Sequence, residues 1–255
     1  MTRWTSSMHR SFSPMKVLRS FAGAALAVGL SAPFVHAQAP SPQLAAVIKG
    51  LDTAAANFHN AQADVSYDNY TRVVRDHSLE TGSIYFERAG KGQEMGAIFF
   101  NLGPDNKPEK SPAKVIAYDG NTLQVYTPGT NQDDVFKAGA NQAKYESFLT
   151  LGFGGSGSDL VKSWTIQDQG PETLSDGAQQ VKTEKLDLVS KDDSVRNLYT
   201  HVTIWVDPVR GLSLKQIFYA PNGDSRTAIY SKIRLNSHID KKPYAISKNA
   251  QRIPH

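Results

Sequence analysis

The sequence predicts an α+β fold in which one helix near the N-terminus precedes a large antiparallel β-sheet. Three observations predict it. Apolar residues first recur at helical spacing, the period then changes to two, and Asp-Gly and Asn-Gly dipeptides join successive alternating segments. Many strands with few helices between them are typical of this class and not of a parallel α/β sheet.

The expected helix is amphipathic and about 15 residues long. It follows an Ala-Pro-Ser-Pro spacer. Its apolar positions recur three or four residues apart, and they are Leu44, Val47, Ile48, Leu51, Ala54, Ala55 and Phe58. After Phe58 the pattern changes to the alternation of a strand, beginning with Ala63, Val65 and Tyr67.

Alternating segments then continue along most of the chain. The expected strands after Tyr67 are 82–88, 94–102, 114–118, 122–127, 180–189, 199–206, 212–220 and 226–235. The dipeptides Asp119-Gly120, Asp207-Pro208 and Asn222-Gly223 supply turns between them. Between Tyr145 and Val161 the pattern is irregular, and it predicts two short helices broken by a flexible glycine segment.

The net positive charge of the chain comes entirely from its N-terminal segment. There are 28 basic and 24 acidic residues, and residues 1–37 contain Arg3, Arg10, Lys16, Arg19 and no acid. The other 218 residues therefore hold 24 groups of each sign. A neutral body excludes a nucleic-acid partner, because binding to phosphates needs clustered excess cations.

Residues 1–37 have the three parts of an export signal. Basic residues precede the apolar run Phe21–Leu30, and Val35-His36-Ala37 has small or β-branched side chains where signal peptidase cuts. We expect cleavage after Ala37, which leaves a domain of residues 38–255. Because the chain has no cysteine for a lipid anchor, we expect this domain to be free in the periplasm.

Motifs for catalysis and metal binding are weak. The absence of cysteine excludes disulfides and thiolate metal sites, and the histidines lack metal-ligand spacing. The segment Gly154–Ser158 has neither the Lys of a phosphate-binding loop nor the second Gly of a nucleophile elbow. We therefore expect no metal, no cofactor and no enzymatic activity. The alternative from another class is an envelope hydrolase that uses Asp207 and a histidine from a neighbouring strand.

Arg88 is in an unusual position. In a strand 82–88, Ile84, Phe86 and Arg88 share one face. Two interpretations are open: Arg88 reaches water from the strand end, or it lies at the rim of an apolar cavity and donates hydrogen bonds across it. The strand 94–102 is apolar on both sides, which predicts that both of its faces are covered.

Three segments carry a resemblance to a known family. They are Glu80-Thr-Gly-Ser-Ile-Tyr-Phe-Glu-Arg88, Asp119-Gly-Asn-Thr-Leu-Gln-Val-Tyr-Thr-Pro128 and Trp205-Val-Asp-Pro-Val-Arg-Gly-Leu212. In this order, behind an export signal and without cysteine, the chain resembles LolA-type periplasmic lipoprotein carriers over nearly all of residues 44–247. The sequence departs from that family at Gln124, where an aromatic residue is common, and in the tail 242–248.

The resemblance implies an incomplete antiparallel β-barrel with a helical lid over an apolar cavity. In that family an arginine at the position of Arg88 hydrogen-bonds to the lid backbone and favours the closed state. Strand parity together with the resemblance predicts the residues that contact acyl chains: Ile84, Phe86, Ile98, Phe100, Val125 and Phe153.

The implied function is to carry lipoproteins to the outer membrane. The implied partners are acylated lipoproteins, an inner-membrane lipoprotein-releasing transporter and an outer-membrane acceptor, and we expect the carrier to be a monomer. An alternative with the same half-barrel is a carrier or sensor of free lipid or glycolipid. The residues alone leave the cargo open.

Overall fold

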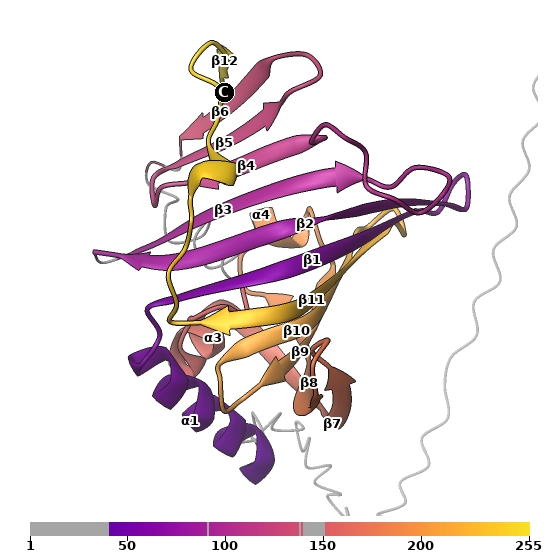
Figure 1. The fold of residues 1–255 in the computed structure, drawn as a ribbon. Coiled ribbons are helices and arrows are strands. Elements are labelled where there is room, and N and C mark those ends of the chain that lie inside the picture. The colour runs from indigo at the N-terminus through magenta and orange to yellow at the C-terminus, as the bar shows by residue number, and fades with distance from the viewer. Residues whose placement is uncertain (1–40, 91, 138, 140–150) are drawn as a thin grey trace, which may run out of the picture. The chain divides into compact units, whose positions relative to one another are not determined.

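A computed structural model describes residues 41–90, 92–137, 139 and 151–255, all within one compact unit (Figure 1). The predicted export signal and most of the first of the two short helices expected after Tyr145 lie outside these residues. The described strands form one sheet of 12 strands, in the order β12-β6-β5-β4-β3-β2-β1-β11-β10-β9-β8-β7. Since β12 and β7 are its two edges, the sheet is open, as in an incomplete barrel.

The strands pair with their sequence neighbours, except at β1–β11 and β12–β6. Their bounds are β1 Asn60–Thr71, β2 Asp76–Ala89, β3 Gly92–Asn101, β4 Lys114–Tyr118, β5 Thr122–Thr127, β6 Gln132–Lys137, β7 Trp164–Ser175, β8 Gln180–Ser190, β9 His201–Asp207, β10 Leu212–Tyr219, β11 Ser225–Leu235 and β12 Gln251–Pro254. The predictions for β4 and β5 are confirmed to the residue. Strands β6 and β12 were not predicted, and no bounds were predicted for β7. In β6, Gln132, Asp133 and Asp134 interrupt any apolar alternation.

The expectation of a wholly antiparallel sheet is wrong at one edge, where β12 pairs with β6 in parallel. The chain reaches that edge by crossing the sheet from β11, along the face seen in Figure 1. Tyr244, in the 3-10 helix η2 (Lys242–Tyr244), fixes this crossing. Its hydroxyl donates to Ser83 Oγ at 3.0 Å, and its ring lies edge-on to Tyr85. A long crossover of this kind is what a parallel pair needs.

Helix α1 (Pro42–Ala56) confirms the predicted 15-residue helix. Ser41 caps it by accepting a hydrogen bond from the backbone N–H of Leu44, and Pro42 occupies the first turn, where no partner for its nitrogen is needed. Two shorter helices are described, α3 (Gly157–Ser163) and α4 (Asp193–Arg196). None of the helices in the described ranges has the length and apolarity that a membrane crossing takes.

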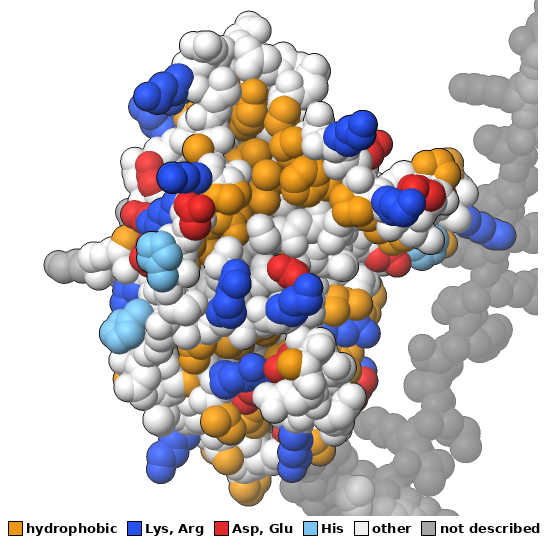
Figure 2. All heavy atoms as spheres, in the orientation of Figure 1, with side chains coloured by type: hydrophobic (Ala, Val, Ile, Leu, Met, Phe, Trp, Pro, Cys, Tyr) orange, Lys and Arg blue, Asp and Glu red, His pale blue; other side chains and the backbone are white. Residues whose placement is uncertain are grey.

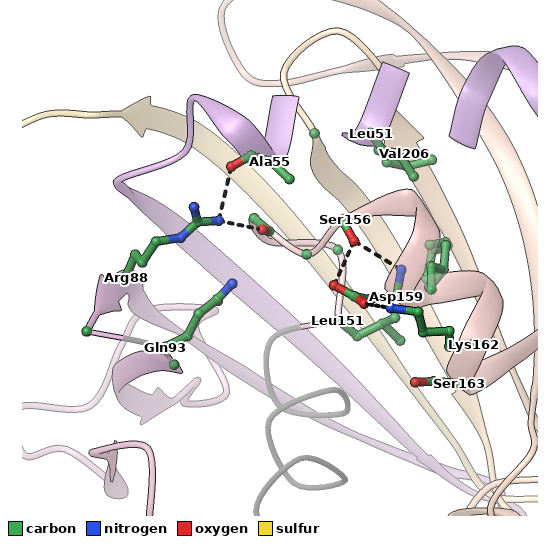
Figure 3. Close-up of a pocket in the computed structure, with 18 residues that line it drawn as sticks. Leu51, Ala55, Arg88, Gln93, Leu151, Ser156, Asp159, Lys162, Ser163 and Val206 are labelled. Atoms are coloured by element: carbon green, nitrogen blue, oxygen red, sulfur yellow. Dashed lines mark hydrogen bonds and ion pairs between the residues drawn. The ribbon is translucent and has the colours of Figure 1, made fainter. Parts of the chain in front are cut away.

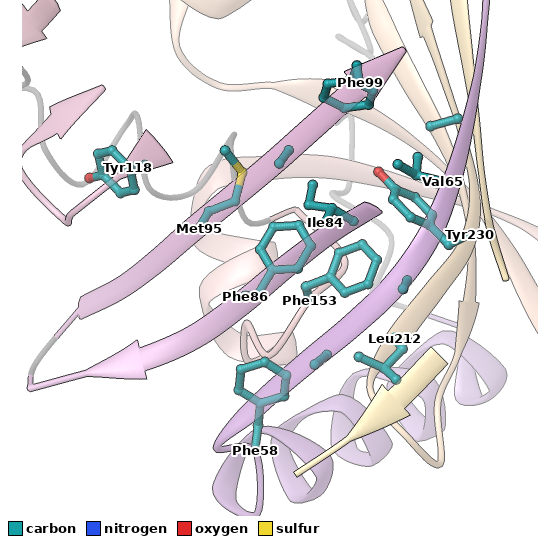
Figure 4. Packing of buried hydrophobic residues seen from close by; sticks show 14 residues of the cluster. Phe58, Val65, Ile84, Phe86, Met95, Phe99, Tyr118, Phe153, Leu212 and Tyr230 are labelled. Atoms are coloured by element: carbon teal, nitrogen blue, oxygen red, sulfur yellow. The ribbon is translucent and has the colours of Figure 1, made fainter. Parts of the chain in front are cut away.

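Two clusters of buried apolar side chains lie on one face of the sheet. The aromatic cluster (Figure 4) comprises Phe58, Ala61, Ala63, Val65, Ile84, Phe86, Met95, Ala97, Phe99, Tyr118, Phe153, Leu212, Ala228 and Tyr230. The aliphatic cluster comprises Leu44, Val47, Leu51, Leu151, Trp164, Leu186, Leu188, Val202, Ile204 and Val206. Burial of each large side chain contributes roughly 1.5–3 kcal/mol, so both clusters stabilise the fold substantially.

Candidate functional site

A hollow of about 520 Å³ opens between α1, the segment before α3 and the sheet (Figure 3). Its apolar lining consists of Leu51, Ala55, Leu151, Leu160, Ile204 and Val206. The polar side chains that line it are Arg88, Gln93, Ser156, Asp159, Lys162 and Ser163. The hollow therefore has apolar walls and a polar border.

Arg88 joins three separate parts of the chain at this border. Its Nη2 donates to the carbonyl oxygen of Ala55 at 3.0 Å and to that of Gly154 at 3.4 Å (Figure 3). Ala55 is in the last turn of α1, and Gly154 precedes α3. The same Ala55 oxygen accepts a hydrogen bond from the backbone N–H of Phe58 at 3.2 Å, so the guanidinium adds a second donor to a carbonyl at the helix end. Arg88 makes these hydrogen bonds and is also exposed to solvent, so the structure has features of both interpretations.

The segment 151–153 is attached to β10 by two hydrogen bonds, and a third continues from β10 to β11. The backbone N–H of Ser213 donates to Gly152 O at 2.8 Å, and Gln216 Nε2 donates to Leu151 O at 2.6 Å. The hydroxyl of Tyr230 in turn donates to Gln216 Oε1 at 3.1 Å. Burial raises the pKa of Tyr230 well above its ordinary value. This buried polar chain holds the segment over the apolar face of the sheet.

Phe153 fills the centre of the aromatic cluster. Its ring stacks on Phe86, with centroids 4.2 Å apart, and meets Tyr230 edge-on at 4.7 Å (Figure 4). It is 1% exposed, although it comes from a loop and not from a helix or strand of the sheet. Its neighbours Gly152 and Gly154 line the hollow, whereas the Phe153 side chain packs in the aromatic cluster.

The glycines of this segment serve close packing, which corrects the expectation of a purely flexible segment. At Gly154, with φ of +72°, an added Cβ would lie 2.3 Å from the ring of Phe58. At Gly157 it would lie 2.2 Å from the backbone oxygen of Ile48 in α1. Gly155 alone among the glycines of 152–157 has open space around it. Any larger residue at 154 or 157 would push the segment away from α1 and its neighbours.

Helix α3 is also tied to α1. Asp52 accepts hydrogen bonds from the backbone N–H and the hydroxyl of Ser158, at 2.9 and 3.0 Å. At the same end of α3, hydrogen bonds from Lys162 and then Ser156 hold the pKa of Asp159 below its ordinary value. Sequence reasoning missed Asp52, because a carboxylate on the polar face of a helix has no distinguishing pattern.

The structure brings together some of the predicted lining residues and separates others. Ile84, Phe86 and Phe153 are in the aromatic cluster. Val125 pairs with Ile116, which packs against that cluster, so Val125 is on the same face.

The other two predicted lining residues are on the opposite face. Ile98 pairs with Ser83 and Phe100 with Thr81, whereas Ala97 and Phe99 take the inner positions. The prediction was wrong because β3 is apolar on both faces, so alternation does not say which is inner. Figure 2 shows hydrophobic side chains gathered on the outer face over β3 and β4, beside the C-terminal crossing.

The described residues give no arrangement that indicates catalysis. In 41–255, apart from the gaps, no three His, Asp or Glu side chains form a group that could hold a metal ion. Asp207, the acid of the hydrolase alternative, accepts hydrogen bonds from the backbone N–H groups of Val209 and Arg210 and from Arg210 Nε at 2.6 Å. It thereby stabilises the turn between β9 and β10.

No protein-family model matches the chain, and no curated protein matches its sequence. An uncharacterised conserved protein from Thermus thermophilus is similar in structure, with a TM-score of 0.47 and 11% identity, over 84% of this chain and 99% of that one. A putative outer membrane lipoprotein-sorting protein domain from Vibrio parahaemolyticus has a TM-score of 0.39 and 13% identity, over 79% and 94%. A LolA superfamily protein from Nitrosomonas europaea has a TM-score of 0.35 and 16% identity, over 81% and 98%. At these identities and TM-scores the likeness assigns no function to this chain.

Proposed function

We propose that residues 38–255 are a periplasmic carrier that binds the acyl chains of lipoproteins and delivers them to the outer membrane. The observation that carries the proposal is the hollow of about 520 Å³ beside a large aromatic cluster, closed by a segment that a few hydrogen bonds hold in place. In this proposal residues 1–37 are the export signal. A releasing transporter in the inner membrane and an acceptor in the outer membrane are the partners of a monomeric carrier.

The energetics suit a cargo of hydrocarbon. Each CH₂ group moved from water to an apolar interior contributes about 0.8 kcal/mol, so a soluble carrier must enclose most of the chain. In this proposal the ring of Phe153, whose neighbours Gly152 and Gly154 line the hollow, separates the hollow from the rest of the aromatic cluster. When that ring moves aside, Ile84, Phe86, Phe99 and Val125 become the continuation of the hollow along the sheet.

Release requires that the cover open without unfolding the sheet. Hydrogen bonds of this kind contribute about 0.5–1.5 kcal/mol each, or about 1.5–3 kcal/mol when one partner is charged. Arg88 holds α1 and the segment before α3 with two such bonds. We propose that it is the latch of a lid formed by α1, α3 and residues 151–156, and that cargo shifts the equilibrium between closed and open states.

Mass spectrometry of the protein purified from a periplasm tests the proposal. Native spectra followed by extraction should show acylated peptide bound to the protein. Free phospholipid or glycolipid in its place would favour the lipid carrier. An empty protein that turns over ester substrates would refute the carrier and support the hydrolase.

The latch has its own test in Arg88→Leu. The variant should keep its fold, since its bonds cross the hollow and not the sheet, but it should deliver cargo to acceptor vesicles or acceptor protein at least several-fold more slowly or not at all. Arg234→Leu is the matched control, because Arg234 is exposed and its guanidinium donates to Gln62 on the sheet, not across the hollow. Transfer by Arg88→Leu at the wild-type rate would remove Arg88 from the mechanism.

A further inference from the structure

A second hollow, of about 530 Å³, lies on the other face of the sheet over β7–β10. In β9, Val202, Ile204 and Val206 face the aliphatic cluster, so the alternate residues His201, Thr203 and Trp205 face the opposite side. This groove is lined by Gln169, Glu172, Lys185, Asp187, His201, Thr203, Trp205, Lys215, Ile217 and Tyr219. It is separate from the proposed acyl site and is mostly polar.

Trp205 forms the floor of the groove with a lysine on each side. Strand register pairs it with Lys185 in β8 and with Lys215 in β10. Both ammonium groups lie over the indole, 5.1 and 4.4 Å from the ring centroid. Nearby, His201 and Tyr219 form a second flat surface, with rings stacked 4.2 Å apart.

Two carboxylates complete the groove. Glu172 Oε2 accepts a hydrogen bond from Trp205 Nε1 at 2.7 Å, and Asp187 Oδ1 accepts one from Thr203 Oγ1 at 2.9 Å. A bulge in β7 between Asp168 and Pro171 shifts the register just before Glu172. Within the described part of the chain, the second oxygen of each carboxylate accepts no hydrogen bond.

The lysines have no acidic partner in the described ranges, although both ammonium groups lie over the Trp205 ring. Neither Lys185 nor Lys215 forms an ion pair with an acid among the described residues, although acids line the same groove. Two ammonium and two carboxylate groups balance in charge, so the groove has no net attraction for an anion such as phosphate. Trp205 is only 4% exposed under the two lysines, so the groove offers donors and acceptors above a covered indole, next to the partly exposed rings of His201 and Tyr219.

We propose that this groove binds an oligosaccharide. Each sugar hydroxyl both donates and accepts, which matches one open oxygen on each carboxylate next to two ammonium groups that have no ion pair among the described residues. Hydrogen bonds to charged groups are stronger than neutral ones, so two acids and two lysines can hold an uncharged ligand. The volume lies in the range of about 300–1,000 Å³ that is usual for small-molecule sites.

The indole N–H of Trp205 reports on the groove directly. In ¹H–¹⁵N NMR spectra of the full domain, titration with chitotetraose or maltotetraose at millimolar concentration should shift the Trp205 indole signal saturably. The signal of Trp164, which is buried in the aliphatic cluster, is the internal control and should not move. The double variant Glu172→Gln, Asp187→Asn should bind about ten- to a hundredfold more weakly.

Asp64→Asn is the matched control, because Asp64 is partly exposed to solvent and pairs with Lys232 away from the groove. Thermal melting of each variant verifies its fold. An unmoved Trp205 signal with both saccharides would overturn the proposal. So would a Trp205 shift with inorganic phosphate alone that Lys185→Met and Lys215→Met abolish, since the groove would then be an anion site. The mass-spectrometric test for bound acyl cargo does not depend on any of these outcomes, so the carrier and the saccharide groove can fail separately.

Discussion

The aromatic and aliphatic clusters occupy the same face of one sheet but are covered in different ways. Leu44, Val47 and Leu51 of α1 pack on the aliphatic cluster, so a whole amphipathic helix covers it. The centre of the aromatic cluster is covered by one ring, Phe153, on a loop that glycines flank. A helix face cannot leave a sheet without exposing several side chains, whereas a ring on a loop can leave alone. The aliphatic cluster therefore holds α1 in place, and we expect residues 151–156 to be the first part of the proposed lid to open.

Leu188→Ala, in the aliphatic cluster under α1, should cause the largest loss of stability. Leu188 is 0% exposed in the aliphatic cluster, and such a truncation costs about 2–5 kcal/mol. Urea unfolding should show that loss, with binding of a fluorescent fatty-acid probe unchanged per folded molecule. Leu51, Leu151, Ile204 and Val206 of this cluster line the hollow but Leu188 does not, so increased uptake of the probe would mean that the cargo site extends to Leu188.

Gly157→Ala tests whether the cover is packed or loose. A Cβ at 157 would meet the backbone oxygen of Ile48, which cannot rotate away, so we expect a loss of about 1–3 kcal/mol. Gly155→Ala is the matched control, because its Cβ would meet open space, and it should change the unfolding midpoint little. Equal effects of the two substitutions would contradict the packed contact between α1 and α3.

Phe153→Ala tests whether the ring that covers the aromatic cluster limits the uptake of cargo. Truncation of a buried Phe usually costs about 3–5 kcal/mol, but here the new space joins an existing hollow, so we expect about half of that loss. Uptake of the fatty-acid probe should rise, measured by fluorescence against the Leu188→Ala variant. A full loss of stability with no gain in uptake would make Phe153 a fixed core residue.

The smallest expected effect concerns Glu184, which lies beside the start of α1. Its Oε1 accepts a hydrogen bond from Gln43 at 2.6 Å, and burial, with the nearby Asp168, raises its pKa above the ordinary value. The folded protein thus holds this proton to higher pH than the unfolded chain, so stability falls as pH rises from the ordinary pKa through the raised one.

Glu184→Gln should remove that penalty. The melting temperature of the variant should exceed that of the wild type by about 1–3 °C at pH 7, and the difference should vanish at about pH 3, where the carboxyl is protonated in both states. Glu109→Gln, at an exposed carboxylate, is the control and should show no such pH dependence. A variant less stable than the wild type at pH 7 would contradict the assignment.

Much of the fold could be predicted because its signals are local. The 15 residues of α1 carry their own period, and the hairpin of β4 and β5 carries both alternation and an Asp119-Gly120 turn. The face of Ile98 could not be predicted, since β3 is apolar on both sides. The edge strand β12 could not be predicted either, because it pairs with residues more than a hundred positions away.

The sequence by itself determined the helix, most strands, the neutral body and the position of Arg88 in line with Ile84 and Phe86. Only the tertiary structure decided what Arg88 contacts, which ring fills the aromatic cluster, and that two lysines and two acids meet around Trp205. The physical reason is distance along the chain. Periodicity reports on neighbours a few residues apart, but Arg88 and Gly154 are 66 residues apart, and only the curvature and register of the sheet bring such residues together.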